Sequence, residues 1–149
     1  MIQKVKSIWM AILSALLSML GLHSCHSFRV EYGCPHADYK FQGSVTGDGK
    51  PVGGIRAVVF NGSPDNKYNA VDTSYTDASG KTERNLPISI PSTELCVKFE
   101  DVDGPENGSW QTKIMPRDQL EFVQTALGDG KWDEGDYTIK ASVELQKAE

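Results

Sequence analysis

Three side chains that could bind a metal or act as a nucleophile stand close together near the N-terminus, where Gly-Leu-His-Ser-Cys-His contains His23, Cys25 and His26. Imidazole and thiolate groups suit Zn²⁺, but a structural zinc site needs about four ligands held by a folded shell. No second pair of His or Cys residues with zinc-site spacing follows in the sequence. We therefore favour the interpretation that this stretch is a processing site.

The residues before this stretch have the features of a secretory signal. Lys4 and Lys6 are the only charged residues before Cys25, and an apolar run covers residues 8–22. A basic start followed by a short apolar run is typical of a cleaved signal peptide. A membrane-spanning helix would need about 20 apolar residues, which is more than this run supplies. We expect residues 1–24 to be a signal peptide that is removed.

The end of this segment, Leu22-His23-Ser24-Cys25, resembles the bacterial lipobox. In that motif a Leu stands three residues before a Cys that is acylated before cleavage, although His23 replaces the usual small residue. The resemblance implies a lipoprotein with palmitate and related acyl chains on Cys25. Each buried CH₂ contributes about 0.8 kcal/mol, so several chains together would hold the protein on a membrane. We expect a membrane-anchored lipoprotein on the periplasmic or cell-surface side.

Two further cysteines, Cys34 and Cys96, could form a disulfide in an exported protein. Two unpaired thiols are the alternative, because sequence alone does not show whether their Cα atoms come within about 7 Å. Cys34 and His36 could also be read as a nucleophile and its base, but such a pair needs a rigid site and these residues flank Pro35 in an expected tether. We expect no enzymatic activity.

Acidic residues gather in two segments that could supply oxygen ligands to Ca²⁺. The first contains Asp101, Asp103 and Glu106, but it lacks the spacing of an EF-hand loop. The second contains Asp129, Asp133, Glu134 and Asp136. Solvated acidic loops are the alternative at both places, and a shared Ca²⁺ site would require the two loops to meet at one end of the domain. We expect no other cofactor.

The charge of the mature chain narrows the classes of partner. The loss of Lys4 and Lys6 from the 15 basic residues leaves 13 against 20 acidic ones, a formal charge of −7. Nucleic acid and anionic lipid both attract clustered Lys and Arg, so this balance disfavours either as a direct partner. Attachment to a membrane would therefore depend on the acyl chains.

Apolar and polar residues alternate with a period of two through most of the mature chain, a pattern typical of β-strands. The expected strands cover residues 41–46, 55–60, 71–76, 95–100, 110–114, 120–126 and 137–146. Turn signals rich in Gly, Pro, Asn and Asp separate them. We predict a lipidated N-terminus and tether over residues 25–38 and one antiparallel β-sandwich of about seven strands over residues 39–149. Its large aromatic side chains should lie in the core or at its rim; these are Phe60, Phe99, Trp110, Phe122 and Trp132.

Two stretches resemble carboxypeptidase regulatory-like, or transthyretin-like, domains: GSVTGDGKPVGGIRAVVF from Gly43 and TSYTDASGKT from Thr73. The turns agree with that pattern, because Gly49 and Gly80 can adopt positive φ and Pro51 restricts φ at the start of the return strand. The resemblance implies a transthyretin-like β-sandwich. Such domains mostly serve as accessory modules, and a fold does not determine a function.

Over a longer span the chain resembles the radical SAM-associated lipoproteins of Bacteroidetes. The stretches that carry this resemblance are EYGCPHADYKFQGSVTGDGKPVGGIRAVV, DTSYTDASGKT, VKFEDVDGPENGSW and GDGKWDEGDY. It implies a link to a radical SAM enzyme. We expect a non-enzymatic accessory or interaction module in the cell envelope, with two alternatives: a substrate or partner of a radical SAM maturation enzyme, or a surface module that binds Ca²⁺ or a glycan.

Overall fold

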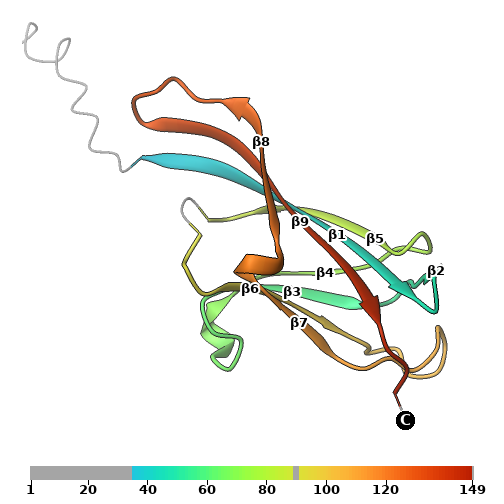
Figure 1. Cartoon of the computed structure of the whole chain (residues 1–149). Coiled ribbons are helices and arrows are strands. Elements are labelled where there is room, and N and C mark those ends of the chain that lie inside the picture. Colours follow the sequence, from blue (N-terminus) through green and yellow to red (C-terminus); the bar gives the residue numbers. More distant parts are fainter. Residues whose placement is uncertain (1–34, 89–90, 149) are drawn as a thin grey trace, which may run out of the picture. The chain divides into compact units, whose positions relative to one another are not determined.

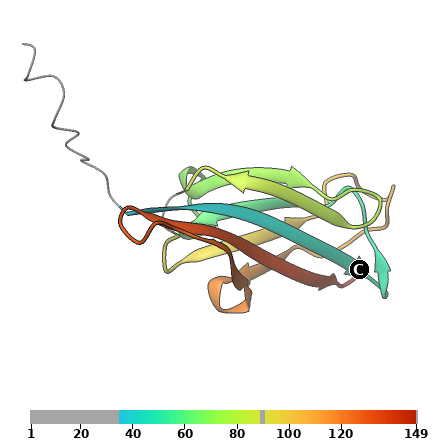
Figure 2. The ribbon, with the colours of Figure 1, turned by 90° about the horizontal axis from the view of Figure 1, so that it is seen from above.

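Two long strands of alternating pattern form the centre of the fold in the computed structural model, which describes residues 35–88 and 91–148. β1 covers His36–Gly47 and β9 covers Asp133–Leu145. They pair in parallel, with Phe41 opposite Ile139, and Figures 1 and 2 show them running side by side in the same direction. Alternate residues of each strand are buried, so the two strands together present one apolar face to the core.

The strands are divided between two sheets. The first, sheet A, has the order β2-β1-β9-β8, and β5 also pairs with β1. The second, sheet B, has the order β4-β3-β6-β7. Besides β1 and β9, sheet A contains β2 (Lys50–Pro51), β5 (Lys81–Leu86) and β8 (Glu121–Leu127). Sheet B contains β3 (Arg56–Asn61), β4 (Ala70–Tyr75), β6 (Leu95–Glu100) and β7 (Lys113–Pro116). Two short 3₁₀ helices complete the set, η1 (Lys67–Asn69) and η2 (Arg117–Gln119).

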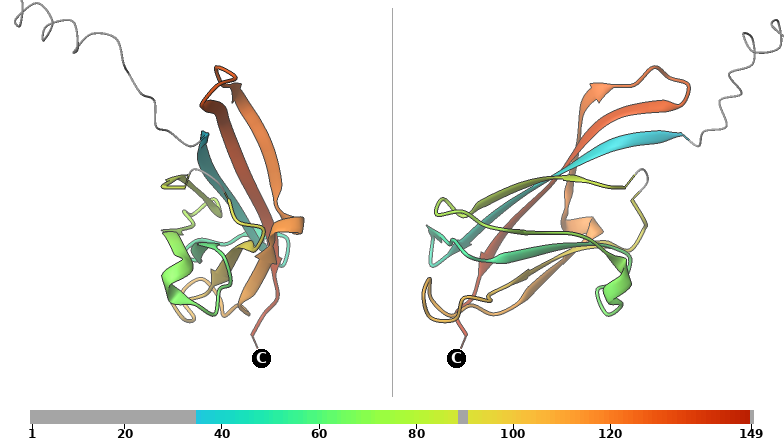
Figure 3. Two further views of the ribbon diagram at one scale, coloured as in Figure 1. Left: turned by 90° about the vertical axis from the view of Figure 1, so that its left-hand side faces the viewer. Right: turned by 180° about the vertical axis from the view of Figure 1, so that it is seen from behind.

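The two sheets pack face to face and enclose the hydrophobic core, which confirms the predicted β-sandwich (Figure 3). Its largest fully buried side chains come from both sheets, and they include Phe41, Ile139, Phe99 and Val97. A smaller cluster lies on the outer side of sheet B and consists of Val58, Phe60 and Cys96. Burial of apolar side chains from both layers contributes roughly 25 cal/mol per Å².

The turn residues adopt the conformations that the sequence predicts. Gly49 and Gly80 have φ of 74° and 71°. A Cβ on Gly80 would overlap with the backbone oxygen of Val45, whose amide donates a hydrogen bond to Gly80 O at 2.8 Å. Asp77 organises the same turn by accepting hydrogen bonds from the amides of Ser79 at 2.8 Å and Lys81 at 3.0 Å.

Three details differ from the sequence-based expectation. The predicted sheets are antiparallel throughout, but β1 and β9 pair in parallel, because they lie far apart in the chain and no hairpin joins them. β1 begins at His36, so residues 36–38 belong to the strand and not to the tether; the His36 amide donates to Trp132 O at 2.8 Å. β7 begins at Lys113, and Trp110 forms a single bridge with Lys147.

Candidate functional site

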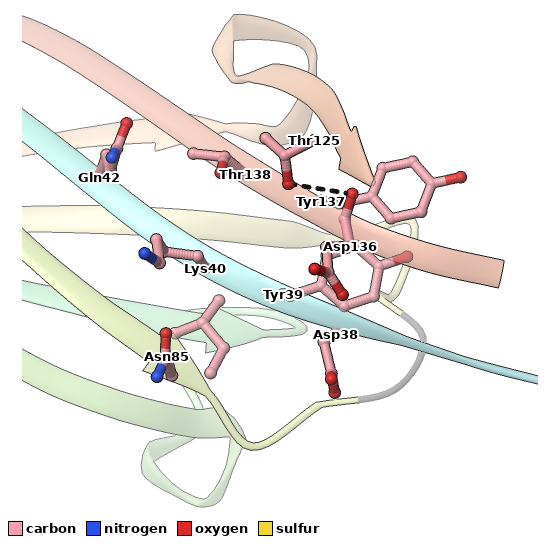
Figure 4. Close-up of a pocket in the computed structure, with 10 residues that line it drawn as sticks. Asp38, Tyr39, Lys40, Gln42, Asn85, Thr125, Asp136, Tyr137 and Thr138 are labelled. Atoms are coloured by element: carbon pink, nitrogen blue, oxygen red, sulfur yellow. Dashed lines mark hydrogen bonds between the residues drawn. The ribbon is translucent and has the colours of Figure 1, made fainter. Parts of the chain in front are cut away.

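The outer face of sheet A carries an open groove of about 570 Å³ that four strands line (Figure 4). Its lining residues are mostly polar: Asp38, Tyr39, Lys40, Gln42, Asn85, Leu86, Thr125, Asp136, Tyr137 and Thr138. A second hollow of about 430 Å³ adjoins it at Gln42, which lines both. We call the first hollow the sheet A groove.

Strand register explains why polar side chains meet in the groove. Along β1, Lys40 and Gln42 alternate with the buried Phe41, so both point away from the core. Lys40 is paired with Asn85 of β5 on one side and with Thr138 of β9 on the other. These three side chains therefore form a polar row across three strands.

The next row is held together by hydrogen bonds and ion pairs. Gln42 lies between Glu83 of β5 and Lys140 of β9. Glu83 accepts hydrogen bonds from Gln42 Nε2 at 2.8 Å and from Lys40 Nζ at 3.0 Å. These two bonds lower the pKa of Glu83 below its ordinary value. Lys140 Nζ lies 3.5 Å from Glu121 on β8, so each lysine has an acidic neighbour.

Two tyrosines adjoin one end of the groove, at strand positions whose side chains share the core-facing side of the sheet with Phe41 and Ile139. Tyr39 and Tyr137 occupy paired positions on β1 and β9, and their rings stack with centroids 5.4 Å apart. Burial, followed by the proximity of Tyr137 and Glu134, raises the pKa of Tyr39 above its ordinary value. On the β8 side, Thr125 Oγ1 donates to the backbone oxygen of Asp136 at 3.3 Å (Figure 4). The groove thus offers amide, hydroxyl, ammonium and carboxylate groups, a set suited to binding a polar ligand by hydrogen bonds.

Of the three cysteines predicted to carry chemistry, only Cys96 lies within the described residues. Cys25 and Cys34 lie outside the described residues, so lipidation and the disulfide stay predictions. Cys96 is 4% exposed on the outer side of sheet B, and its thiol donates to Gly62 O at 3.6 Å. Burial raises the pKa of the Cys96 thiol, which lowers its nucleophilicity at neutral pH.

The first acidic segment uses its carboxylates to close a loop. Asp101 accepts hydrogen bonds from the amides of Trp110 at 2.9 Å and Asp103 at 3.3 Å. Asp103 accepts from Asn107 Nδ2 at 2.6 Å. Glu106 is exposed. Within residues 35–88 and 91–148, no three His, Cys, Asp or Glu residues are grouped so that they could hold a metal ion.

The second acidic segment lies at the other end of β9. Asp129 accepts hydrogen bonds from the amides of Lys131 at 2.8 Å and Asp133 at 3.3 Å, and these bonds lower its pKa. Asp133 begins β9, whereas the Trp110 loop pairs with residues just after its end, where Gln111 donates to Gln146 O. A strand of 13 residues spans about 40 Å, so the two acidic segments do not meet.

Four of the five aromatic residues lie in the core or at its rim, as predicted, whereas Trp132 is exposed. Phe99 is fully buried and Phe60 is 7% exposed, while Trp110 and Phe122 are partly buried against the core. Trp132 is 38% exposed at the β8–β9 hairpin.

The sheet A groove could not be predicted from the sequence. The alternation along β1 and β9 does place Lys40, Gln42 and Thr138 on polar faces, but it does not reveal that the two strands are neighbours. The sequence signal that could have indicated a groove was the polar face on each of these two strands. The parallel pairing that joins them is a property of the tertiary structure.

In the part of the chain that the structure describes, no helix is long and apolar enough to cross a membrane. No protein-family model matches the chain. No curated protein matches it either.

Two solved structures show distant similarity. Catechol 1,2-dioxygenase from Pseudomonas arvilla C-1 is 14% identical with a TM-score of 0.48, and the match covers 80% of this chain and 55% of that one. The shaft pilin SpaA from Lactobacillus rhamnosus GG is 13% identical with a TM-score of 0.31, and the match covers 71% of this chain and 48% of that one. The chain thus matches about half the length of these proteins.

Proposed function

We propose that this protein is a lipid-anchored, non-enzymatic interaction module of the cell envelope and that the sheet A groove contacts its partner. The observation that carries the proposal is the convergence of polar side chains from four strands in one open groove. Glu83 holds Lys40 and Gln42 in place through two hydrogen bonds, so less side-chain freedom is lost when a ligand binds.

The lipid anchor rests on the leader and on the lipobox-like residues before Cys25. Labelled palmitate should enter the full-length chain and should be lost when Cys25 is replaced by Ala. Cys34→Ala serves as the matched control, because it removes a thiol only nine residues away. Unchanged incorporation in Cys25→Ala would remove the anchor from the proposal.

The role of the groove can be tested by crosslinking in native membranes. A photoreactive amino acid at Asn85 would face the groove, whereas the same amino acid at Thr73 would lie on β4 of the opposite sheet. We expect a discrete crosslinked product from Asn85 and none of that product from Thr73. Equal products from both positions would contradict a specific role of the groove.

A polyhydroxylated ligand such as a glycan fits the chemistry of this groove. Asn85 and Thr138 can each donate and accept hydrogen bonds, and the charge of Lys40 is paired with that of Glu83 in the next row. Binding to an array of envelope glycans should be weakened by Asn85→Ala and unchanged by Thr73→Ala. A glycan that binds both variants equally would not occupy the groove.

A further proposal comes from sequence. The family resemblance supports a role as substrate or partner of a radical SAM maturation enzyme; the intact mass with and without that enzyme should then differ beyond acylation. Ca²⁺ binding by Asp101, Asp103 and Glu106 is not proposed, because the structure does not group these residues as metal ligands.

A further inference from the structure

Most edges of the two sheets are protected against pairing with another chain. β2 has only two residues and ends in Pro51. β7 has four residues, begins with Lys113 and ends in Pro116. Short strands, lysine and proline are the features that natural proteins use to prevent edge-to-edge association.

The facing edges of β4 and β5 protect each other. Arg84 of β5 donates from Nε to Asp72 of β4 at 3.0 Å, so the two strands are bridged across the side of the sandwich. β5 also carries Lys81 and Glu83. An incoming strand would have to displace this ion pair and approach a charged edge.

β8 lacks this protection. It has seven residues, Glu-Phe-Val-Gln-Thr-Ala-Leu, and only its first residue, Glu121, is charged. β9 is its one partner strand among the described elements. Figures 1 and 3 show β8 at the margin of sheet A with β9 on one side of it. The other side therefore presents backbone N–H and C=O groups that no described strand pairs.

We propose that β8 pairs in an antiparallel manner with β8 of a second copy of this chain and joins two A sheets into one. The sequence of β8 is compatible with its own copy about a two-fold axis at Val123. Val123 then faces its copy, Phe122 faces Gln124, and Glu121 faces Thr125. No like charges lie opposite each other, and the central pair is a β-branched cross-strand contact of a favourable kind.

The irregularity of β8 sets the length of the pairing. The register with β9 shifts between Gln124 and Ala126. A shift of this kind bends and twists the strand, so regular pairing ends there. The proposed contact therefore covers about residues 121–125.

This pairing has a consequence for the sheet A groove. A two-fold axis perpendicular to an antiparallel sheet leaves the outer faces of both copies on the same side. Thr125, which lines the groove, lies two residues from the proposed axis. The dimer would present two neighbouring grooves to one multivalent partner, and simultaneous engagement would raise the overall affinity. The pairing itself uses only β8 and does not depend on lipidation or on the identity of the ligand.

Strand pairing of this length buries less than the roughly 1,200 Å² of a stable interface, so the dimer should be weak in dilute solution. Crosslinking can capture such a weak contact at the concentration that the protein has in the cell. Two variants, each with one introduced cysteine, are made in the full chain that also carries Cys34→Ser. One is Val123→Cys, and the control is Ile114→Cys on the protected edge β7. Cell membranes that contain each variant are then treated briefly with an oxidant. We expect a disulfide-linked dimer from Val123→Cys alone. No dimer, or equal dimer from both positions, would overturn the proposal.

A charge-exchange experiment separates dissociation from misfolding. Val123→Lys and Val123→Glu each place like charges across the axis, so each variant alone should sediment as one chain in detergent solution. Their mixture should recover the mass of two chains, because Lys then faces Glu. Recovery can occur only if both variants are folded. The β8 contact would be excluded if the mixture failed to associate at concentrations where the unsubstituted chain is dimeric. It would also be excluded if the unsubstituted chain were monomeric at all concentrations and did not crosslink. A crosslink from β8 to another protein and not to a second copy would overturn the proposal in favour of a hetero-partner.

Discussion

The indole ring of Trp110 covers Gly47 so closely that a Cβ atom on Gly47 would overlap with the six-membered ring. Gly47 ends β1, and Trp110 lies in the loop before β7, where its ring packs against the core. The Trp110 Nε1–H donates to Asn107 O at 2.9 Å, which holds the ring in this position. Trp110 thus closes one end of the sandwich over a glycine.

The first prediction follows from this contact. Gly47→Ala should lower the free energy of unfolding by about 1–3 kcal/mol, because the methyl group displaces a packed ring. Trp110→Ala should lower the free energy of unfolding by less in the Gly47→Ala background than in the unsubstituted chain. Urea denaturation of the four proteins gives the coupling energy. Additive effects would mean that the two residues do not compete for this space.

The second prediction concerns Thr76, a buried residue that joins two segments through its hydroxyl group. Thr76 Oγ1 donates to Val52 O at 2.8 Å and accepts from the amide of Ile55 at 3.0 Å. Thr76→Val should destabilise the protein by about 1–3 kcal/mol, since it leaves both backbone groups buried without this partner. The same substitution at the exposed Thr73 is the control and should have little effect on the urea midpoint. Equal losses at both positions would point to β-propensity or packing and not to the hydrogen bonds.

The third prediction concerns the dependence of stability on pH. Hydrogen bonds from the Ser79 hydroxyl and then from backbone amides lower the pKa of Asp77. A group whose pKa is lowered on folding contributes stability above its unfolded pKa, about 3.9, and loses that contribution as the pH falls through the folded value. Asp77→Asn should therefore be less stable than the unsubstituted protein at neutral pH.

The difference between these two proteins should shrink as the pH falls below about 4, because protonation removes the same charge from Asp77. Urea denaturation over a series of pH values measures it. A difference for Asp77→Asn that is the same at all pH values would show that the charge of Asp77 is not involved.

The fourth prediction concerns Cys96. Because its thiol is buried and its pKa is raised, thiol reagents should modify Cys96 slowly in the native protein and rapidly after unfolding without reductant. Val102→Cys, at a side chain that is 45% exposed, provides an accessible thiol for comparison. Peptide mapping assigns the modified residue. A Cys96 that stays unreactive after unfolding, together with a mass that is lower by two hydrogens, would establish the disulfide with Cys34.

Local sequence patterns predicted the strands because their period reports which side of each strand is apolar. Phe41 and Val45 in β1, and Ile139 and Val143 in β9, could be assigned to the core before any contact was known. The turns at Gly49 and Gly80 were predictable for a similar reason, since positive φ is a local requirement that glycine meets. The candidate Ca²⁺ ligands Asp101 and Asp103 were recognisable as a carboxylate cluster, but their use as acceptors for loop amides depends on the position of Trp110 and Asn107.

The sequence by itself determined the sandwich class and the inward residues of most strands. The tertiary structure alone decided that β1 lies parallel to β9, that Lys40 stands between Asn85 and Thr138, and that β8 has one partner strand among the described elements. The physical reason is that alternation of side chains depends on the local backbone, whereas the choice of partner strand depends on how the whole core packs and on hydrogen bonds between segments about a hundred residues apart.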